Sequence, residues 1–359
     1  MNNTKMILML ENGKVLKCDG FGYIQESIGE IVFNTGMAGY QDTFTDPSYF
    51  GQIIVMTYPL IGNCGINLDD NESNGPKIRG LVINELCEYP SNFRNVMLLS
   101  EYLYNNKIIG VQNIDTRELV KIIRDNGTMK AIITPENSFN LEDAKEKIEK
   151  FYEKNIISNV STKKIIHYDG DGEKIVIIDC GVKQNIIRSL LQRNCEIYQV
   201  PYNINYKEIF KLNPDGIVLS NGPGDPKDCS DVIKTTKKIF GKIPIFGICL
   251  GHQMLALANG ADTEKLKYGH RGINHPVKDL DNDLVYITSQ NHGYTIVKNS
   301  IKEDTMRISH INVNDNSIEG MIYKDAFTSS VQFHPEASPG PKDTAYLFDK
   351  FINELKNLK

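Results

Sequence analysis

The sequence lacks the features that mark membrane-spanning and nucleic-acid-binding chains. Its most apolar later stretch, Ile243–Ala258, is interrupted by proline, glycine, histidine and glutamine, so it cannot supply the roughly 18–20 uninterrupted apolar residues of a spanning helix. The first apolar run, Met6–Leu10, is followed at once by Glu11 and is too short for a signal-peptide core. The formal net charge is −5, which argues weakly against nucleic acid or anionic membrane as a main ligand, since both need a basic surface, but does not exclude local basic patches. We therefore expect neither a membrane nor nucleic acid as a partner.

The chain also lacks the cysteine pattern of a disulfide scaffold or a zinc ribbon. Its seven cysteines are odd in number, scattered, and include no Cys-x-x-Cys pair. This usage is typical of the reducing cytoplasm, where we expect the protein to reside. Six of the seven are expected to be small buried residues, the usual environment of free cysteine. No internal repeat or low-complexity tract is evident.

The composition is that of a globular protein large enough for two hydrophobic cores. The length of 359 residues predicts two domains or one large one. The composition, 40% hydrophobic and 24% charged, can fill more than one core. We place a first domain at residues 1–154, a polar linker at 155–172 and a second domain at 173–359.

The first domain mixes short strand-like runs with two expected helices. Asp115 is placed to cap the first helix, which should end at Asn126 before Gly127. The second helix, Leu141–Tyr152, carries its apolar residues on one side. This pattern predicts a mixed β/α domain.

The second domain alternates strand-like runs with helical segments such as Asn185–Arg193. The expected strands are Lys174–Asp179, Ile197–Val200, Gly216–Ser220 and Pro244–Gly247. Alternation of this kind predicts an α/β fold with a doubly wound, mostly parallel sheet covered by helices on both faces. Such sheets place active sites at the carboxyl ends of their strands.

A sharp chemical signal follows the last of these strands. Gly247-Ile248-Cys249-Leu250-Gly251 lies between a strand and a helix-forming run, as a nucleophile elbow does. Glycine fits the tight flanks of such a turn because it has no Cβ. The alternative is a structural cysteine buried between two packing glycines, but the strand–turn–helix context favours a nucleophile.

A nucleophilic cysteine needs a base, and His334 is the best candidate. Residues i and i+2 of an extended segment point to the same side, so Glu336 can orient the His334 ring as the acid of a triad does. By itself a His-x-Glu pattern is a weak signal, and it would usually indicate two solvent-exposed side chains in a loop. His252 has no neighbouring carboxylate and fits a helix-packing role better, and His292 is the second choice of base.

Two other segments contain residues of the kinds that bind ligands. His270 and His275 have no third ligand at a suitable spacing, so we expect no metal site. Ser220–Pro226 is rich in turn formers and lacks the G-x-x-x-x-G-K-[ST] pattern of a phosphate loop. It is either an ordinary turn or a rigid loop that presents backbone N–H groups to an oxyanion.

Together, Gly247–Gln253, Ser220–Pro226 and His334–Glu336 resemble the motifs of class I, triad-type glutamine amidotransferases, which hydrolyse glutamine to glutamate and ammonia. The first domain resembles the N-terminal domain of the carbamoyl-phosphate synthetase small subunit, which other amidotransferases lack. The segments that carry this narrower resemblance are Phe33–Asp42, Thr45–Tyr49, Tyr58–Gly65, Ser91–Arg94, Ile114–Arg117, Gly269–His270, Asn274–Val277, Gln290–Gly293 and Glu336–Pro341.

The resemblance implies a role for each matching residue. Cys249 would be the nucleophile, His334 the base and acid, and Glu336 the group that orients it. Backbone N–H groups of Gly222 and Leu250 would stabilise the oxyanion. The implied glutamine contacts are Ser48, Gly222, Gly224, Leu250, Gln253, Asn291, Gly293 and Tyr294. The family often has Phe at the position of Tyr294, and small hydroxyl residues at those of Gly36 and Ala38.

The resemblance also implies a partner. It is a large subunit that receives ammonia through a tunnel and makes carbamoyl phosphate from bicarbonate and ATP, for pyrimidine or arginine biosynthesis. This chain has no Walker A motif, so ATP and divalent metal are expected on the large subunit of the heterodimer and no cofactor on this chain. Two alternatives stay open: a stand-alone cysteine γ-glutamyl hydrolase and a non-catalytic interaction subunit.

Overall fold

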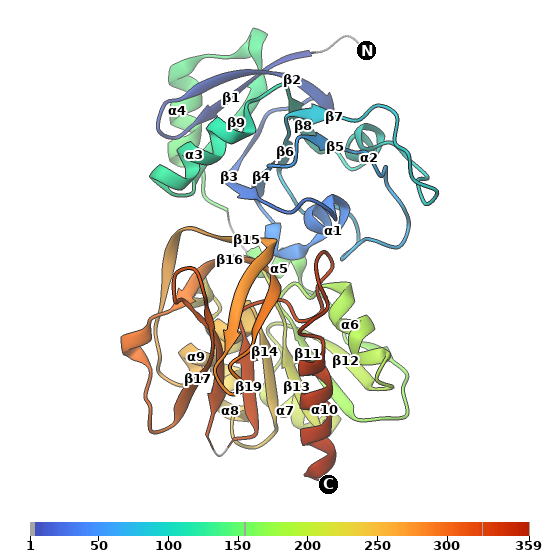
Figure 1. Cartoon of the computed structure of the whole chain (residues 1–359), viewed down its shortest axis with the longest axis vertical. Helices are drawn as coiled ribbons and strands as arrows, with labels where there is room; N and C mark the ends of the chain where they lie inside the picture. Colours follow the sequence, from blue (N-terminus) through green and yellow to red (C-terminus); the bar gives the residue numbers. More distant parts are fainter. Residues whose placement is uncertain (1–3, 154–155, 325, 359) are drawn as a thin grey trace. The chain divides into compact units, whose positions relative to one another are not determined.

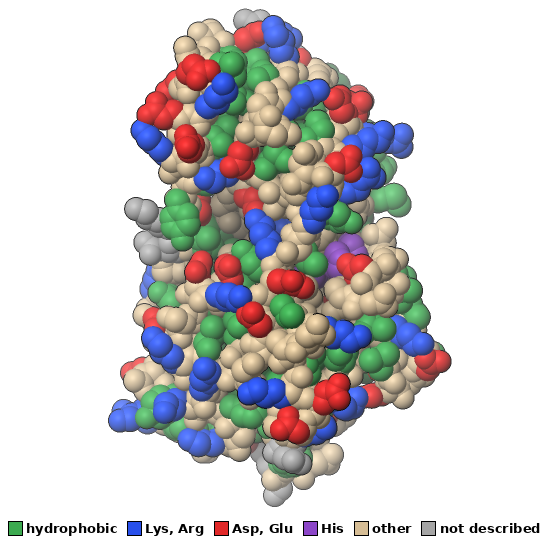
Figure 2. Space-filling view, turned by 90° about the vertical axis from the view of Figure 1, so that its left-hand side faces the viewer, with side chains coloured by type: hydrophobic (Ala, Val, Ile, Leu, Met, Phe, Trp, Pro, Cys, Tyr) green, Lys and Arg blue, Asp and Glu red, His purple; other side chains and the backbone are tan. Residues whose placement is uncertain are grey.

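The chain divides into two compact units, Met1–Lys154 and Asn155–Lys359, and each is described here by itself (Figure 1). This computed structural model describes residues 4–153, 156–324 and 326–358. Among these residues no helix combines the length and the hydrophobicity needed to traverse a bilayer. On the face shown in Figure 2, acidic and basic side chains are interspersed.

The first unit is built around a closed barrel. In barrel order its strands are β1 (Thr4–Leu10), β2 (Val15–Gly22), β8 (Ile109–Gln112), β6 (Gly80–Val82), β4 (Gln52–Met56), β3 (Ser27–Asn34) and β9 (Met129–Pro135). Around it lie α1 (Tyr40–Thr45), α2 (Leu99–Asn105), α3 (Thr116–Asn126), α4 (Leu141–Lys150), the 3-10 turns η1 (Pro47–Tyr49) and η2 (Glu136–Ser138), and the short pair β5 (Leu60–Ile61) and β7 (Glu85–Leu86).

Alternate barrel residues face different apolar clusters, as the two-residue period of a strand requires. In β1, Leu8 packs with residues of α3, whereas Ile7 packs with Ala144 and Ile148 of α4. The expected cap of α3 is confirmed, because the Asp115 side chain accepts a hydrogen bond from the N–H of Glu118 at 2.9 Å. The helix predicted at Leu141–Tyr152 is α4 and ends at Lys150.

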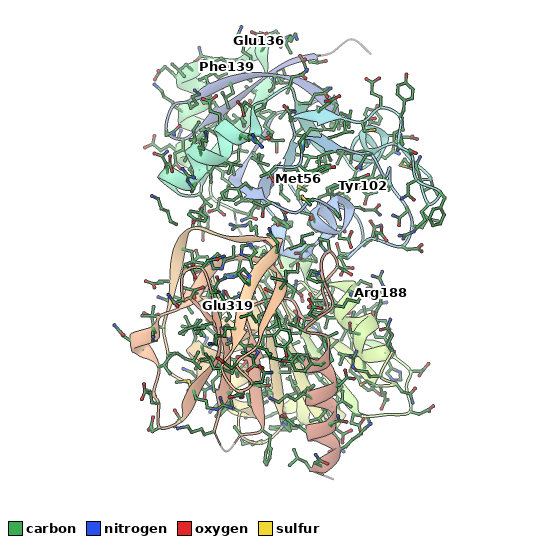
Figure 3. All side chains as sticks on the ribbon, in the orientation of Figure 1. Met56, Tyr102, Glu136, Phe139, Arg188 and Glu319 are labelled. Carbon is green, nitrogen blue, oxygen red and sulfur yellow. The ribbon has the colours of Figure 1, made fainter. Side chains whose placement is uncertain are left out.

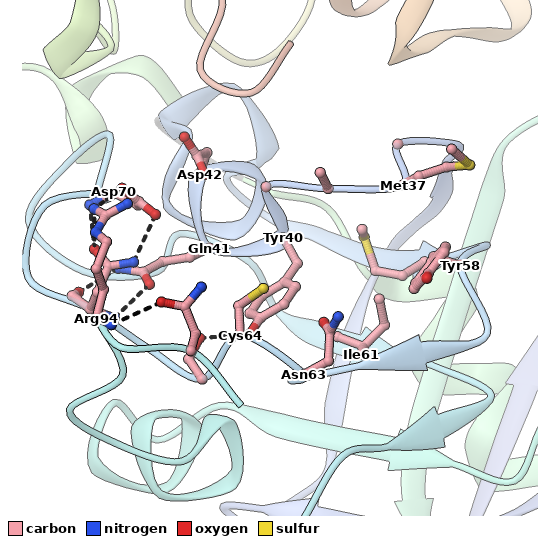
Figure 4. Close-up of a pocket in the computed structure, with 17 residues that line it drawn as sticks. Met37, Tyr40, Gln41, Asp42, Tyr58, Ile61, Asn63, Cys64, Asp70 and Arg94 are labelled. Carbon is pink, nitrogen blue, oxygen red and sulfur yellow. Dashed lines mark hydrogen bonds and ion pairs between the residues drawn. The ribbon is translucent and has the colours of Figure 1, made fainter. Parts of the chain in front are cut away.

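The first unit also holds a pocket of about 280 Å³ (Figure 4). Tyr40, Gln41 and Cys64 line it, and Arg94 forms an ion pair of 2.5 Å with Asp70 at one end. Gly36 and Ala38, the two positions that depart from the family pattern, line the same pocket.

The second unit contains one sheet of ten strands. Its order is β10 (Ile166–Tyr168), β12 (Glu196–Pro201), β11 (Lys174–Asp179), β13 (Gly216–Leu219), β14 (Ile245–Ile248), β19 (Thr328–Val331), β18 (Ile318–Tyr323), β17 (Met306–Asn312), β15 (Thr263–Asp279) and β16 (Val285–Ile296). The strands from β12 to β19 are parallel. The apolar runs predicted this for β12, β11, β13 and β14, whereas β19 was not among the expected strands. An antiparallel extension from β18 to β16, which the sequence patterns did not predict, continues the sheet.

Helices cover both faces of the parallel part, which confirms the doubly wound architecture. On one face, α7 (Tyr206–Leu212), α8 (Ser230–Ile239) and α9 (Leu250–Ala258) pack against β11, β13 and β14. On the other, α6 (Gln184–Leu191) and α10 (Tyr346–Asn357) pack against alternate residues of the same strands. The short turns η3 (Pro226–Asp228) and η4 (Lys298–Ser300) lie in the connections.

The segment expected to be a linker, 155–172, contains regular structure in its described part. It carries α5 (Ile156–Val160) and β10, and β10 pairs antiparallel with β12. The cysteine expectation was partly wrong. Cys18, Cys180, Cys195 and Cys229 are buried, but Cys64 is exposed and Cys87 half-buried, because both lie outside the barrel strands and the helices.

Candidate active site

The nucleophile elbow predicted at Cys249 is present. Cys249 follows β14 and precedes α9 with φ 54° and ψ −105°, a sparsely populated conformation of the kind that turns a nucleophile out of a sheet edge. Its backbone N–H donates to Val331 O of β19 at 2.8 Å, which ties the turn to the neighbouring strand. The side chain is buried, and Sγ lies 3.6 Å from the backbone oxygen of Asn291.

Close backbone packing explains why glycine occupies the positions beside Cys249. A Cβ atom on Gly251 would lie 2.1 Å from Leu219 O, and one on Gly247 would lie 2.9 Å from Gly251 O. Both separations are shorter than real side chains allow. The elbow therefore depends on glycine at both flanks.

The loop after β13 approaches the elbow equally closely. A Cβ on Gly222 would lie 2.1 Å from Cys180 O and 3.0 Å from a methyl carbon of Leu250. Leu250 is the first residue of α9, where backbone N–H groups have no acceptor within the helix. Gly222 and Leu250 are therefore brought together, as an oxyanion site built from their two N–H groups requires.

His334 and Glu336 form the expected pair. His334 Nδ1 lies 2.7 Å from Glu336 Oε1, and both side chains are almost fully buried. The backbone of His334 pairs with Ser289 of β16, donating its N–H to Ser289 O at 2.9 Å. The expected extended geometry is wrong beyond His334, because Pro335 and Glu336 lie in a turn closed by a hydrogen bond from the N–H of Ala337 to His334 O at 3.1 Å. The turn brings the Glu336 carboxylate back to the His334 ring.

Charges around His334 favour its protonated form. Burial by itself lowers the pKa of the imidazole, but the Glu336 carboxylate and Cys249 outweigh it and raise the pKa of His334 to about 10. His334 Nε2 is buried, and an interaction of the ring with the Cys249 thiol contributes to the raised pKa of His334. Because Nδ1 is held by Glu336, Nε2 is the nitrogen available to exchange a proton with a thiol or a substrate.

Lys183 is a component of the site that the sequence analysis missed. Its side chain is 3% exposed, its Nζ lies 3.1 Å from Glu336 Oε1, and it also donates to Ala337 O. Burial would raise the pKa of Glu336, but Lys183 and then His334 lower it to about 2. Asn185 donates to the backbone oxygen of Glu336. Both residues follow β11 at the carboxyl edge of the sheet, which is the signal that could have found them.

Several of the implied glutamine contacts of the second unit lie on elements beside the elbow. Gln253 of α9 donates to Tyr294 O and to Gln332 Oε1, each at 2.9 Å. Asn291, Gly293 and Tyr294 lie on β16, which passes beside Cys249. Gly224, with φ 95°, lies near Ile156 of α5.

Ser48, the remaining implied glutamine contact, lies in the first unit. It is buried in η1, and its N–H donates to Asp46 Oδ1 at 2.8 Å.

The alternative histidines have other contacts. His252 is fully buried with Nδ1 2.8 Å from Ser330 Oγ, which confirms its packing role. Burial lowers the pKa of His252 to about 3. The ring nitrogens of His292 lie 2.8 Å from Tyr294 O and 2.9 Å from Gln290 Oε1, so His292 is engaged away from the nucleophile.

Comparison with known proteins agrees with this geometry. The family described as glutamine amidotransferase class-I matches residues 176–354. The second unit is thus a class I glutamine amidotransferase domain. The family described as carbamoyl-phosphate synthase small chain, CPSase domain, matches residues 8–133.

Full-length relatives extend the match to the whole chain. It is 55% identical to the carbamoyl phosphate synthase small chain of Clostridium perfringens, covering 97% of this chain and 99% of that one. It is 49% identical to the Listeria innocua small chain, covering 99% and 98%. It is 50% identical to the pyrimidine-specific small chain of Bacillus subtilis, covering 98% and 96%. The chain belongs to the carbamoyl phosphate synthase small chain family.

Proposed function

We propose that this chain is the glutaminase subunit of a carbamoyl phosphate synthase, with Cys249, His334 and Glu336 as its catalytic triad. The observation that supports the assignment is the buried Glu336–His334 pair, joined at 2.7 Å, and Cys249 is among the groups that raise the pKa of His334. A cysteine, a base and an orienting carboxylate in this order are the minimal parts of a thiol amidase.

The proposed reaction uses each of these groups. His334 Nε2 accepts the Cys249 proton, and Sγ attacks the side-chain carbonyl carbon of glutamine. N–H groups of Gly222 and Leu250 stabilise the tetrahedral oxyanion. His334 then returns the proton to the departing nitrogen, which leaves as ammonia. Water, deprotonated by His334, attacks the thioester, and glutamate and the free thiol are released.

Binding of glutamine is assigned to the residues around the elbow. Backbone and side-chain groups of Gly222, Gly224, Leu250, Gln253, Asn291, Gly293 and Tyr294 would contact the substrate. Ser48 of the first unit is the remaining proposed glutamine contact.

The proposed partner is the large subunit, to which this chain passes ammonia. At neutral pH free ammonia is mostly protonated and no longer nucleophilic, so direct transfer protects the reactive form. The thioester chemistry draws on no cofactor from this chain, and we assign ATP and its divalent metal to the large subunit. A cytoplasmic location is proposed from the seven free thiols.

The experiment is a glutaminase assay of Cys249→Ser in complex with the large subunit. We expect loss of glutamine hydrolysis and of glutamine-dependent carbamoyl phosphate synthesis, while synthesis from added ammonium continues. Cys195→Ser, which changes a buried cysteine of the same unit, is the matched control and should keep glutaminase activity.

Two results would contradict the proposal. Undiminished glutaminase activity in Cys249→Ser would remove the thiol from the mechanism. A chain that hydrolyses glutamine but neither binds a large subunit nor supplies it with ammonia would instead be a stand-alone γ-glutamyl hydrolase.

A further inference from the structure

A second cluster of buried polar side chains lies in the antiparallel part of the second unit's sheet. His270 of β15 and His292 of β16 are cross-strand partners whose ring centroids are 5.0 Å apart. Gln290 of β16 lies between the rings, with its Oε1 3.0 Å from His270 Nδ1 and 2.9 Å from His292 Nε2. Glu319 of β18, labelled in Figure 3, is buried beside them. The cluster therefore joins three strands of the antiparallel extension.

Hydrogen bonds between protein groups hold this cluster together. Asn312 Nδ2 of β17 and Ser317 Oγ each donate to Glu319 Oε1 at 3.3 Å. A glutamine amide can donate or accept at the place that Gln290 occupies, according to which way it is turned, so this one side chain can bind both rings. Because the partners come from β16, β17 and the turn before β18, these hydrogen bonds fix those segments relative to one another.

An ion pair fixes His270 from the outer side of the cluster. Its Nε2 lies 2.8 Å from Asp315 Oδ2. Burial by itself lowers the pKa of His270, but Asp315 and Glu319 outweigh it and raise this pKa to about 9. Asp315 is in turn held by Ser317, which donates its N–H and its hydroxyl to Asp315 Oδ1 at 3.0 and 2.8 Å. The turn between β17 and β18 therefore presents a fixed carboxylate to the imidazole.

The other side of the cluster leads to the backbone of β16. His292 Nδ1 lies 2.8 Å from Tyr294 O, and Gln253 Nε2 of α9 donates to the same oxygen at 2.9 Å. Asn291, the residue before His292, has its backbone oxygen 3.6 Å from Cys249 Sγ. Successive side chains of a strand point to opposite faces. The cluster thus supports from one face the strand segment that passes beside the nucleophile.

We propose that His270 and its partner Asp315 position residues 291–294 of β16 for glutamine binding. This positioning role rests on the proposed function, because the segment carries three of the assigned glutamine contacts. A segment that is already ordered binds a ligand at a smaller cost in conformational entropy than one that the ligand must order. The nucleophile, its base and the proposed oxyanion donors lie on other segments. Loss of the ion pair should therefore weaken substrate binding and spare the chemical step.

The test measures KM and kcat for glutamine hydrolysis by the full chain in complex with the large subunit. Asp315→Asn removes the charge from a turn position whose side chain is 42% exposed, and His270→Gln removes the imidazole. Asp315→Asn should raise KM by about 3–10-fold, the effect of one partly exposed charged hydrogen bond, and His270→Gln by at least as much. In both variants kcat should stay near the wild-type value. Asp315→Glu, which restores a carboxylate, should recover most of the lost affinity.

A second readout follows occupancy of the site separately from turnover. Iodoacetamide alkylates a nucleophilic thiol, and bound glutamine should protect Cys249, which is followed by mass spectrometry of its peptide. In both variants the glutamine concentration that gives half-protection should rise by the same factor as KM. The alkylation rate of Cys249 without glutamine should stay at the wild-type value, because the elbow itself is unchanged.

Asp281→Asn is the matched control. Asp281 has the same 42% side-chain exposure and pairs with Arg307 at 2.6 Å, so its replacement breaks an ion pair of similar exposure in the same unit and should leave KM unchanged. A wild-type KM in both Asp315→Asn and His270→Gln overturns the positioning role. It is also overturned if kcat and thiol alkylation fall as much as glutamine affinity does. A wild-type complex that hydrolyses no glutamine contradicts the proposed function, and the positioning role with it.

Discussion

Replacement of Lys183 by methionine tests whether the buried cation sets the charge state of the triad. Lys183 and Glu336 are 3% and 0% exposed and lie 3.1 Å apart. Removal of one partner of a buried ion pair costs about 3–5 kcal/mol, because the other charge remains buried and unpaired. We expect Lys183→Met to lose about this much of its free energy of unfolding.

The pKa of Glu336 determines how the free energy of unfolding should change with pH. The pKa of Glu336 is about 2 in the folded chain and 4.5 ordinarily, so ionised Glu336 adds stability above about pH 4.5 that is lost as the pH falls towards 2. Lys183 is the largest cause that lowers this pKa. In Lys183→Met the pKa of Glu336 should rise, and the dependence of unfolding on pH between 4.5 and 2 should become shallower.

Activity provides a second readout. Without Lys183, Glu336 accepts protons more readily and holds the His334 ring less firmly, so kcat for glutamine hydrolysis should fall more than KM changes. The acid limb of the pH–rate profile should move to higher pH. Lys174→Met is the control, because Lys174 is a half-buried lysine of β11 that pairs with Glu196 at 3.6 Å. A Lys183→Met chain with the stability, kcat and pH profile of wild type would refute the reasoning.

Three further changes test other parts of the structure. Gly222→Ala puts a Cβ 2.1 Å from Cys180 O, so kcat should fall by about 100-fold or more as the proposed oxyanion donor is displaced; unchanged kcat would argue against that role. Asp115→Ala removes the cap of α3 and should cost about 1 kcal/mol in urea unfolding, whereas Asp125→Ala at the exposed end of the same helix should cost less. Burial lowers the pKa of His252 from 6.5 to about 3. Between these pH values His252 is protonated in the unfolded chain and neutral in the folded chain, so the free energy of unfolding should fall as the pH drops from 6.5 towards 3. His252→Gln should reduce that slope, and an unchanged slope would show that His252 does not contribute.

Local sequence patterns were enough to predict much of the fold and the candidate site of the second unit. Apolar runs and turn residues identified β11 at Lys174–Asp179 and predicted the parallel strands around it. The glycines beside Cys249 predicted the elbow, because the tight turn leaves no room for a Cβ at either flank. The His334–Glu336 pair could be predicted because the two residues are only two positions apart, although a turn, and not the expected extended segment, brings their side chains together.

Contacts between distant segments could be decided only by the tertiary structure. Lys183 joins the triad through Glu336, 153 residues away in sequence, and no spacing rule connects two such positions. His270, Gln290, His292 and Glu319 come from separate segments of the sequence, but antiparallel pairing of β15, β16, β17 and β18 brings them into one buried polar cluster. The sequence thus predicted the proposed nucleophile and its base, since both lie in short local motifs. Strand order and register decided which buried charges surround them, because these depend on the pairing of strands far apart in the chain.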